Sequence, residues 1–112
     1  MTKDILNDLI AQNQKTCDFT FNEITQENSA LKLNDDTASV GFIYRHIGEI
    51  MHLLAQFLGF PTDVENLSEK EWKETLDTPF FGTISRVRLL GHILYHTTYH
   101  CGQITLTLKR GK

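Results

Sequence analysis

Several residue types and patterns are scarce in this sequence of 112 residues. It has only two prolines, Pro61 and Pro79, so long helices can run uninterrupted on either side of them. No stretch approaches the roughly 18 consecutive apolar residues that a membrane span requires, which predicts no membrane contact. Lys3, Asp4 and Asp8 lie where a signal peptide would have its apolar run, and a cytoplasmic protein is therefore expected.

Cysteine and clustered charge are also scarce. Cys17 and Cys101 lack the spacing of a metal-binding or disulfide framework, and we expect both thiols to be buried as small apolar groups. The 11 basic and 14 acidic residues give a net charge of −3 and form no block of one sign. Because nucleic-acid affinity depends mainly on clustered Lys and Arg, no nucleic acid is expected as a partner.

Hydrophobic residues make up 40% of the chain, enough for the core of one domain spanning residues 1–112. They recur at steps of three or four, as on one face of a helix, and no window alternates as a half-buried strand would. Long helices are predicted at about residues 2–27, 38–58 and 83 or 85–109, with Asp36 or Thr37 capping the second. The second helix should bury one continuous face, formed by Phe42, Ile43, His46, Ile47, Ile50, Leu53, Leu54 and Phe57.

The segment between the last two long helices is less regular. Gly59, two residues before a proline, is expected to end the second helix. Ser68-Glu69-Lys70-Glu71 has the form of a capping box, which predicts a short helix to about Leu76. Residues 77–82 are then expected to form a turn. The fold predicted from the pattern is an all-α helical bundle.

Three histidines occupy apolar faces where leucines would be expected. His96 and His100 are four residues apart, so they point from one face of the last helix. His46 lies inside the apolar face of the second helix. Buried imidazoles need hydrogen-bond partners, and a divalent metal ion would satisfy one nitrogen of each ring at once. The alternative is a set of core histidines with ordinary hydrogen bonds. We favour the metal, which three imidazoles suit if it is zinc, nickel, iron or copper.

Four other polar residues lie near the predicted site. His52 should point away from it, because it follows His46 by six residues and lies on another side of the helix. His92 lies at the margin of the apolar face and is the alternative ligand to His100. Glu49 and Gln103 each follow a predicted ligand by less than one turn and could orient it. Glu49 is also the candidate catalytic residue, as a general base.

Two segments carry a resemblance to a known family. Residues 90–104, which contain His96-Thr97-Thr98-Tyr99-His100-Cys101-Gly102-Gln103-Ile104, resemble the H-x-x-x-H-x-G-Q-I signature of the DinB family. Residues 39–49 are similar to the family's other characteristic block, where an apolar stretch leads into His46. The resemblance implies an up-down four-helix bundle, often a homodimer, with a metal bound by three histidines near one end. It assigns the ligand roles to His46, His96 and His100.

The sequence departs from the family pattern between the two motif helices. The long third helix of the family is reduced here to a short one, which leaves apolar faces to be covered. Either this member is short, which we favour, or a segment between about Pro61 and Ser68 is missing from the sequence. We expect the intervening segment to fold back over the bundle and a partner chain to close the remainder. Its apolar residues are Val64, Leu67, Trp72, Leu76, Phe80 and Phe81.

Two classes of function follow from these observations. The resemblance implies an enzyme, either a metal-dependent hydrolase or a thiol-dependent S-transferase that acts on a small molecule. Three histidines would leave a coordination position open for such chemistry. The alternative is a metal-stabilised or ligand-binding bundle without catalysis. Glu49 should discriminate between them, because a carboxylate that points at the metal favours catalysis and one that points to solvent does not.

Overall fold

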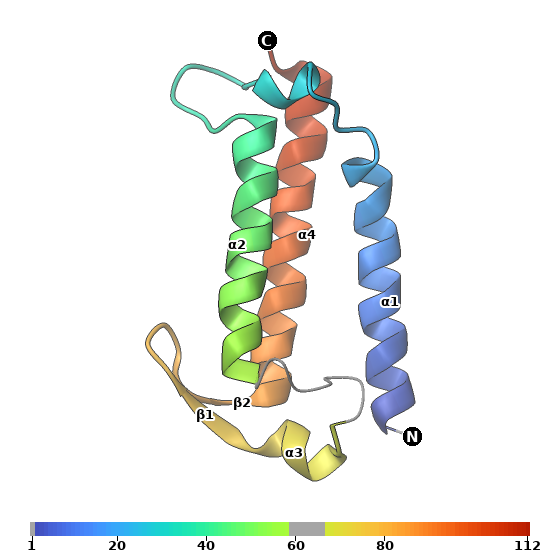
Figure 1. Cartoon of the computed structure of the whole chain (residues 1–112), viewed down its shortest axis with the longest axis vertical. Helices are drawn as coiled ribbons and strands as arrows, with labels where there is room; N and C mark the ends of the chain where they lie inside the picture. The colour runs from blue at the N-terminus through green and yellow to red at the C-terminus, as the bar shows by residue number, and fades with distance from the viewer. Residues whose placement is uncertain (1, 59–66) are drawn as a thin grey trace.

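Three long helices dominate the computed structural model, which describes residues 2–58 and 67–112 (Figure 1). They are α1 (Thr2–Phe21), α2 (Val40–Leu58) and α4 (Arg86–Arg110). α4 is the central helix, because α1 and α2 both pack against it. Figure 1 shows α1 and α4 running in the same direction and α2 in the opposite one. The prediction of a mostly helical protein is confirmed.

Local hydrogen bonds shift two predicted helix boundaries. The first helix ends at Phe21, six residues before its predicted end, and a short 3-10 helix, η1 (Asn28–Ala30), follows. In between, the Asn28 side chain accepts from the backbone N–H of Thr25 at 2.7 Å, and the Thr25 hydroxyl accepts from that of Asn28 at 3.1 Å. Such side-chain bonds to nearby backbone compete with a continuing helix.

The start of α2 also differs from the prediction. Ser39, not Asp36 or Thr37, accepts a hydrogen bond from the first turn of the helix, at 3.2 Å from the backbone nitrogen of Phe42. Thr37 bonds instead within its own turn, to the carbonyl of Asn34 at 3.0 Å. The predicted end of α2 at Gly59 lies outside the described residues. Most of the segment 60–69, where a stretch of sequence could be missing, also lies outside them.

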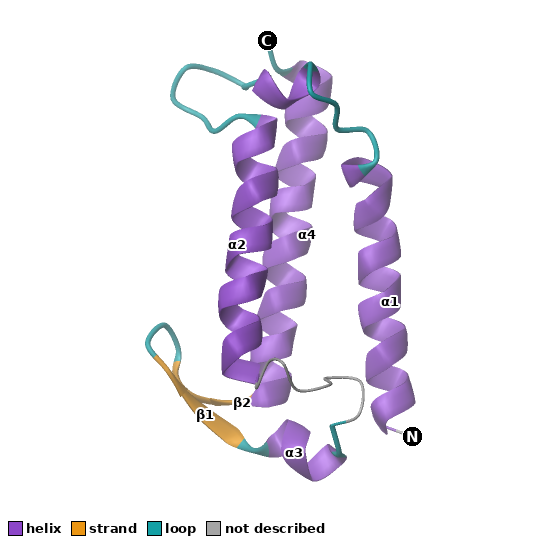
Figure 2. Cartoon of the chain, viewed as in Figure 1, coloured by secondary structure: helices purple, strands orange, loops and turns teal. Residues whose placement is uncertain are grey.

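The connection to α4 contains strands that the sequence pattern did not predict (Figure 2). Helix α3 (Glu69–Lys73) begins with the predicted capping box but stops three residues short of Leu76. Strands β1 (Thr75–Thr78) and β2 (Gly82–Ser85) then form an antiparallel hairpin. Four-residue strands are too short for a clear alternating pattern. Gly82 closes the hairpin with a φ of +67°, a conformation that other residues rarely adopt.

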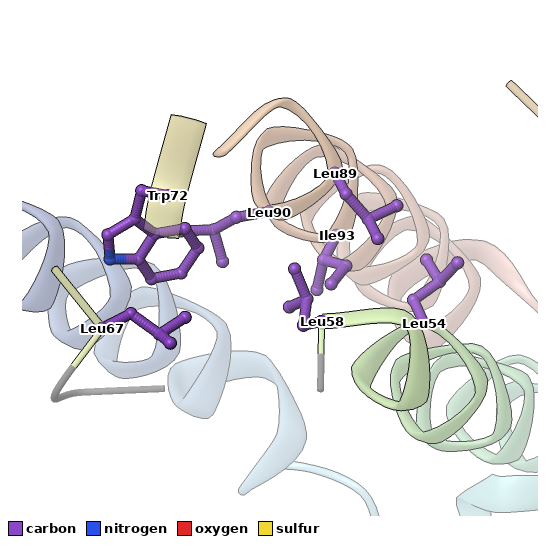
Figure 3. Packing of buried hydrophobic residues seen from close by; sticks show 7 residues of the cluster. All are labelled: Leu54, Leu58, Leu67, Trp72, Leu89, Leu90 and Ile93. Atoms are coloured by element: carbon purple, nitrogen blue, oxygen red, sulfur yellow. The ribbon is translucent and has the colours of Figure 1, made fainter. Parts of the chain in front are cut away.

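α3 is attached firmly to the end of the bundle. Trp72 is only 3% exposed and packs in an apolar cluster with residues of α2 and α4 (Figure 3). Arg86 at the start of α4 donates to the backbone carbonyls of Leu58 at 3.3 Å and Glu71 at 3.0 Å. The buried members of the cluster are Leu54, Leu58, Leu67, Trp72, Leu89, Leu90 and Ile93.

The predicted covering role of this segment is therefore confirmed for some residues and not for others. Leu67 and Trp72 are buried, whereas Phe80 and Phe81 in the hairpin turn are exposed. Val64 lies outside the described residues. Two residues predicted on the buried face of α2, Phe42 and Leu53, are also exposed. The side chain of Phe57 is not among those described.

A second apolar cluster lies at the opposite end of α2 and α4, around Val40, Ile43, Ile47 and Ile104. On α4 the predicted ligands His96 and His100 fall between the two clusters, whereas on α2 His46 lies between Ile43 and Ile47 of the second cluster. No helix in the described part of the chain is both long and apolar enough to cross a bilayer.

The interface between α1 and α4 has a different character. Asn13 donates to the Thr98 hydroxyl at 2.7 Å, and the Thr20 and Thr105 hydroxyls share a hydrogen bond of 2.8 Å. Between these pairs, the thiol of Cys101 lies 3.8 Å from the carbonyl oxygen of Cys17. Both thiols are buried, as predicted. A hollow of about 500 Å³ runs along this polar seam. Apolar contacts hold α1 near its ends, where Leu6, Ile10 and Phe21 pack on the two clusters.

Candidate metal centre

The three histidines of the two apolar faces come together between α2 and α4. His46 projects from α2, and His96 and His100 project from successive turns of α4. Their ring centroids lie 5.0 Å apart for His46 and His96, 4.7 Å for His46 and His100, and 4.4 Å for His96 and His100. One ligand nitrogen from each ring lies within 4.8 Å of the others. The cluster can therefore hold a metal ion.

The distance between two of the rings fits a shared ion. Nε2 of His46 and Nε2 of His96 are 3.2 Å apart. Two nitrogens bound at about 2.0–2.1 Å to one tetrahedral ion lie about 3.3–3.4 Å apart. This pair meets the separation of about 3.5 Å expected for ligands of one ion, and the ligand nitrogens of all three rings lie within 4.8 Å of one another.

The electrostatics of the cluster keep His96 neutral. The pKa of His96 is lowered from its ordinary value near 6.5 to about 4, first by burial and then by the neighbouring His100, His46 and His92, in that order of importance. A neutral imidazole has the lone pair that metal coordination needs.

His96 is also incompletely satisfied by the protein. Its Nδ1 is buried and has no hydrogen-bond partner among the described groups. Its Nε2 faces another imidazole nitrogen, so the two lone pairs require a proton or a cation between them. A donor set of this kind fits a divalent cation.

Gln103 fixes the orientation of the third ring. Nδ1 of His100 donates to Oε1 of Gln103 at 2.5 Å. This hydrogen bond places the proton on Nδ1 and leaves Nε2 of His100 free to coordinate. The orienting contact predicted for Gln103 is therefore present.

Glu49 has a different partner from the one its predicted role requires. Its Oε1 accepts a hydrogen bond from Nε of Arg45 at 2.6 Å, and its side chain is 60% exposed. It lines a small hollow with His46, but it makes no described hydrogen bond to any of the three histidines. By the criterion set above, this position does not favour Glu49 as a catalytic base.

The other two histidines lie outside the cluster. His52 is exposed on α2, and its Nε2 lies 3.4 Å from Nε2 of Gln56, which agrees with the prediction that it points away from the site. The centroid of the His92 ring lies 4.5 Å from that of Phe81 and 6.0 Å from that of His96. His92 is thus a neighbour of the centre and not one of the three grouped histidines.

Sequence reasoning did not identify the residues around the opening of the site. A hollow of about 520 Å³ touches His46 and His100, and Phe42, Leu106 and the loop before α2 form much of its wall. Phe42 precedes His46 by one turn and was assigned to the buried core. Phe42 lies four residues before His46 in the sequence, and this closeness to a predicted ligand could have indicated that it lines the site.

Comparison with known proteins decides the family. A model of the DinB family matches residues 16–111, which include all three clustered histidines and Gln103. The chain belongs to the DinB family. Searches of curated proteins and of solved structures gave no match. Membership of the DinB family confirms the resemblance, and the described part of the connection between the two motif helices consists of the short α3 and the hairpin.

Proposed function

We propose that this DinB-family protein binds one divalent ion through His46, His96 and His100 and acts as a thiol-dependent S-transferase. The observation that carries the proposal is the approach of the two Nε2 atoms to 3.2 Å in a cluster of three imidazoles. Zinc, nickel and iron all accept such ligands, and the donor set alone does not select among them.

Held by His46, His96 and His100, the ion would supply an open coordination position that lowers the pKa of a bound thiol. The thiol proton would pass to solvent, and the sulfur would form a bond to an electrophilic carbon as that carbon's bond to the leaving group breaks. The residues of the chain position the ion. Gln103 orients His100, and the α2–α4 packing holds His46 against His96. Thiol transfer is favoured over hydrolysis because Glu49, the predicted base for hydrolysis, is paired with Arg45 at the surface.

Metal titration of matched variants tests the site. His46→Ala and His96→Ala should each lose most of the zinc or cobalt affinity, because two imidazoles remain. His52→Ala is the control, since it removes an exposed imidazole of α2 and should leave the affinity unchanged. Equal affinity in all of these proteins would refute the metal site. A screen of thiols with small electrophiles, on the metal-loaded protein, then tests the transferase activity.

A second candidate function is a metal-stabilised bundle without catalysis. The exposed position of Glu49 favours it, because this acidic group makes no described bond to the cluster. In that case the metal would raise the stability of the protein, and the thiol screen would show no turnover with any metal. Turnover that disappears in His96→Ala would exclude this candidate.

We also propose that the bundle keeps the DinB four-helix architecture, with α3 and the hairpin in place of a long third helix, and that it forms a homodimer. The face left open carries a continuous series of aromatic rings, each within 6.0 Å of the next. A second copy would cover this aromatic strip, formed by Phe80, Phe81, His92, Tyr95 and Tyr99. Tyr95→Lys should then increase the monomer fraction in sedimentation, and a monomeric wild-type protein at micromolar concentration would refute the homodimer.

A further inference from the structure

The hollow of about 520 Å³ beside the histidines has an uncharged wall. None of its ten lining residues is Asp, Glu, Lys or Arg, and five of them are aliphatic or aromatic: Leu33, Ala38, Phe42, Ile43 and Leu106. The other five are polar: Thr37, His46, His100, Gln103 and Thr107. Its volume lies within the range of about 300–1,000 Å³ that is usual for small-molecule sites. We call this hollow the apolar pocket.

Charge appears only beyond the apolar pocket. A neighbouring hollow of about 450 Å³ shares Thr37, Ala38 and Phe42 with it and adds Lys32, Asp35 and Asp36. The outer hollow therefore has two carboxylates against one ammonium group. A ligand that extends outward from the histidines meets an apolar section first and a section of net negative charge second.

Phe42 occupies a special position between these spaces. It is 64% exposed, although it belongs to the helix that carries His46 and precedes that residue by one turn. Its side chain lines the apolar pocket, the outer hollow and the small hollow beside Glu49. Leu106, on α4, is 50% exposed and also lines the apolar pocket. A ligand in the pocket would remove apolar surface of both residues from water, which is favourable.

We propose that the apolar pocket selects small molecules in which an uncharged hydrophobic chain is joined to a metal-binding head group. The head would lie at the histidines, and the chain would contact Phe42 and Leu106, which determine the specificity. Asp35 and Asp36 would disfavour a negatively charged outer end. The inference deepens the proposed function and rests on it for the head group, whereas the pocket for the chain is formed by protein residues alone.

Linear alcohols provide a test that does not depend on the metal. Binding of n-butanol to n-heptanol to the metal-free protein would be followed by NMR of the methyl groups of Leu33, Ile43 and Leu106. Affinity should rise about fourfold for each added methylene, since burial of one CH₂ contributes about 0.8 kcal/mol. Hexanoate should bind more weakly than n-hexanol. The proposal would be overturned if the affinity for the alcohols did not depend on chain length. It would also be overturned if the alcohols shifted only the NMR signals of other methyl groups.

Matched substitutions locate the effect. Phe42→Ala and Leu106→Ala should each reduce the affinity for n-heptanol, by about tenfold for the phenylalanine. Phe19→Ala is the control, because Phe19 is 69% exposed on α1 and does not line the pocket. All three residues lie outside the buried core, so the variants should fold. Equal losses in all three variants would overturn the assignment of Phe42.

Two further readouts separate this inference from the proposals before it. The cobalt-loaded protein would be titrated with n-alkanethiols, and sulfur-to-cobalt absorption should show the same dependence on chain length as the alcohols. Thiol binding without that dependence would overturn the pocket and leave the metal site intact. Alcohol binding without metal binding would refute the metal site and support the pocket. If a second copy fills the pocket instead, alcohols will not bind and Phe42→Ala will increase the monomer fraction, which also overturns the proposal.

Discussion

Replacement of His96 by leucine should stabilise the metal-free protein while it abolishes metal binding. His96 lies between the two apolar clusters, and its Nδ1 is buried without a hydrogen-bond partner among the described groups. Leucine fills a similar space and has no polar atom to satisfy. The substitution therefore removes an unfavourable feature of the metal-free folded state.

The magnitude follows from two opposing contributions. Relief of a buried unsatisfied polar atom contributes about 1–3 kcal/mol, and loss of the contact between His96 and His46 costs about 0.5–1.5 kcal/mol. The midpoints of these two ranges differ by about 1 kcal/mol, so His96→Leu is expected to raise the free energy of unfolding without metal by about 1 kcal/mol. For a protein of this size that corresponds to roughly 4 °C in melting temperature.

The same residue predicts a dependence on pH. The pKa of His96 is lowered to about 4 in the folded protein, so between pH 6.5 and 4 the unfolded chain binds a proton that the folded chain does not. The stability of the metal-free wild-type protein is therefore complete above pH 6.5 and falls as the pH drops toward 4, by about 1–2 kcal/mol when partial solvent screening is included. His96→Leu should have a shallower dependence over this range.

Urea unfolding with a chelator, at pH 7.5 and at pH 5, measures both effects. His52→Leu is the matched control, because it replaces an exposed imidazole of α2. The reasoning is refuted if His96→Leu is less stable than the wild type in chelator at pH 7.5. A wild-type stability in chelator that is the same at pH 7.5 and at pH 5 would refute the assignment of the pH effect to His96.

Three further predictions concern the ion, its support and the thiols. Zinc at 100 times its dissociation constant should raise the free energy of unfolding by about 2.7 kcal/mol in the wild type and by much less in His46→Ala, as denaturant titrations would show. Gln103→Leu should weaken metal binding by roughly 10- to 100-fold in competition with a chelator and leave the fold unchanged by circular dichroism, because His100 loses its orienting acceptor. Burial raises the pKa of Cys17 from 9.0 to about 11, so its alkylation should be slow at pH 7 and accelerate up to pH 11, and a reaction complete within minutes at pH 7 would contradict this burial.

The sequence was informative where a polar residue interrupted an apolar helical face. His46, His96 and His100 were recognisable because imidazoles are costly in a core unless they have partners, and the structure brings them together. The capping box at Ser68 and the start of α4 after Ser85 were also predictable, because each depends on a local hydrogen bond. The capping box and the start of α4 are set by neighbours within a few residues, whereas the meeting of His46 with His96 and His100 depends on the packing of α2 against α4.

Other features depend on contacts that a local pattern does not contain. Thr25 and Asn28 end the first helix early through a pair of bonds that any of several nearby polar residues could have made. The hairpin has only four residues per strand, below the length at which alternation is visible. Phe42 looked like a core residue by period, but a wall of the bundle that would cover it is absent from the described residues. The position of Glu49 depends on Arg45, which competes with the histidines for its carboxylate.

The polar interface between α1 and α4 should let α1 unfold locally more easily than α2 and α4. α1 is held along its middle by hydroxyl, amide and thiol contacts beside a hollow, whereas α2 and α4 share the apolar clusters and the histidines. Interfaces with few buried apolar contacts open at lower free energy than the global transition. The amide protons of α1 should therefore exchange with deuterium first, and a bound ion should slow exchange in α2 and α4 without equal protection of α1. α1 would then open separately, while α2 and α4 stay packed together and keep His46, His96 and His100 in place.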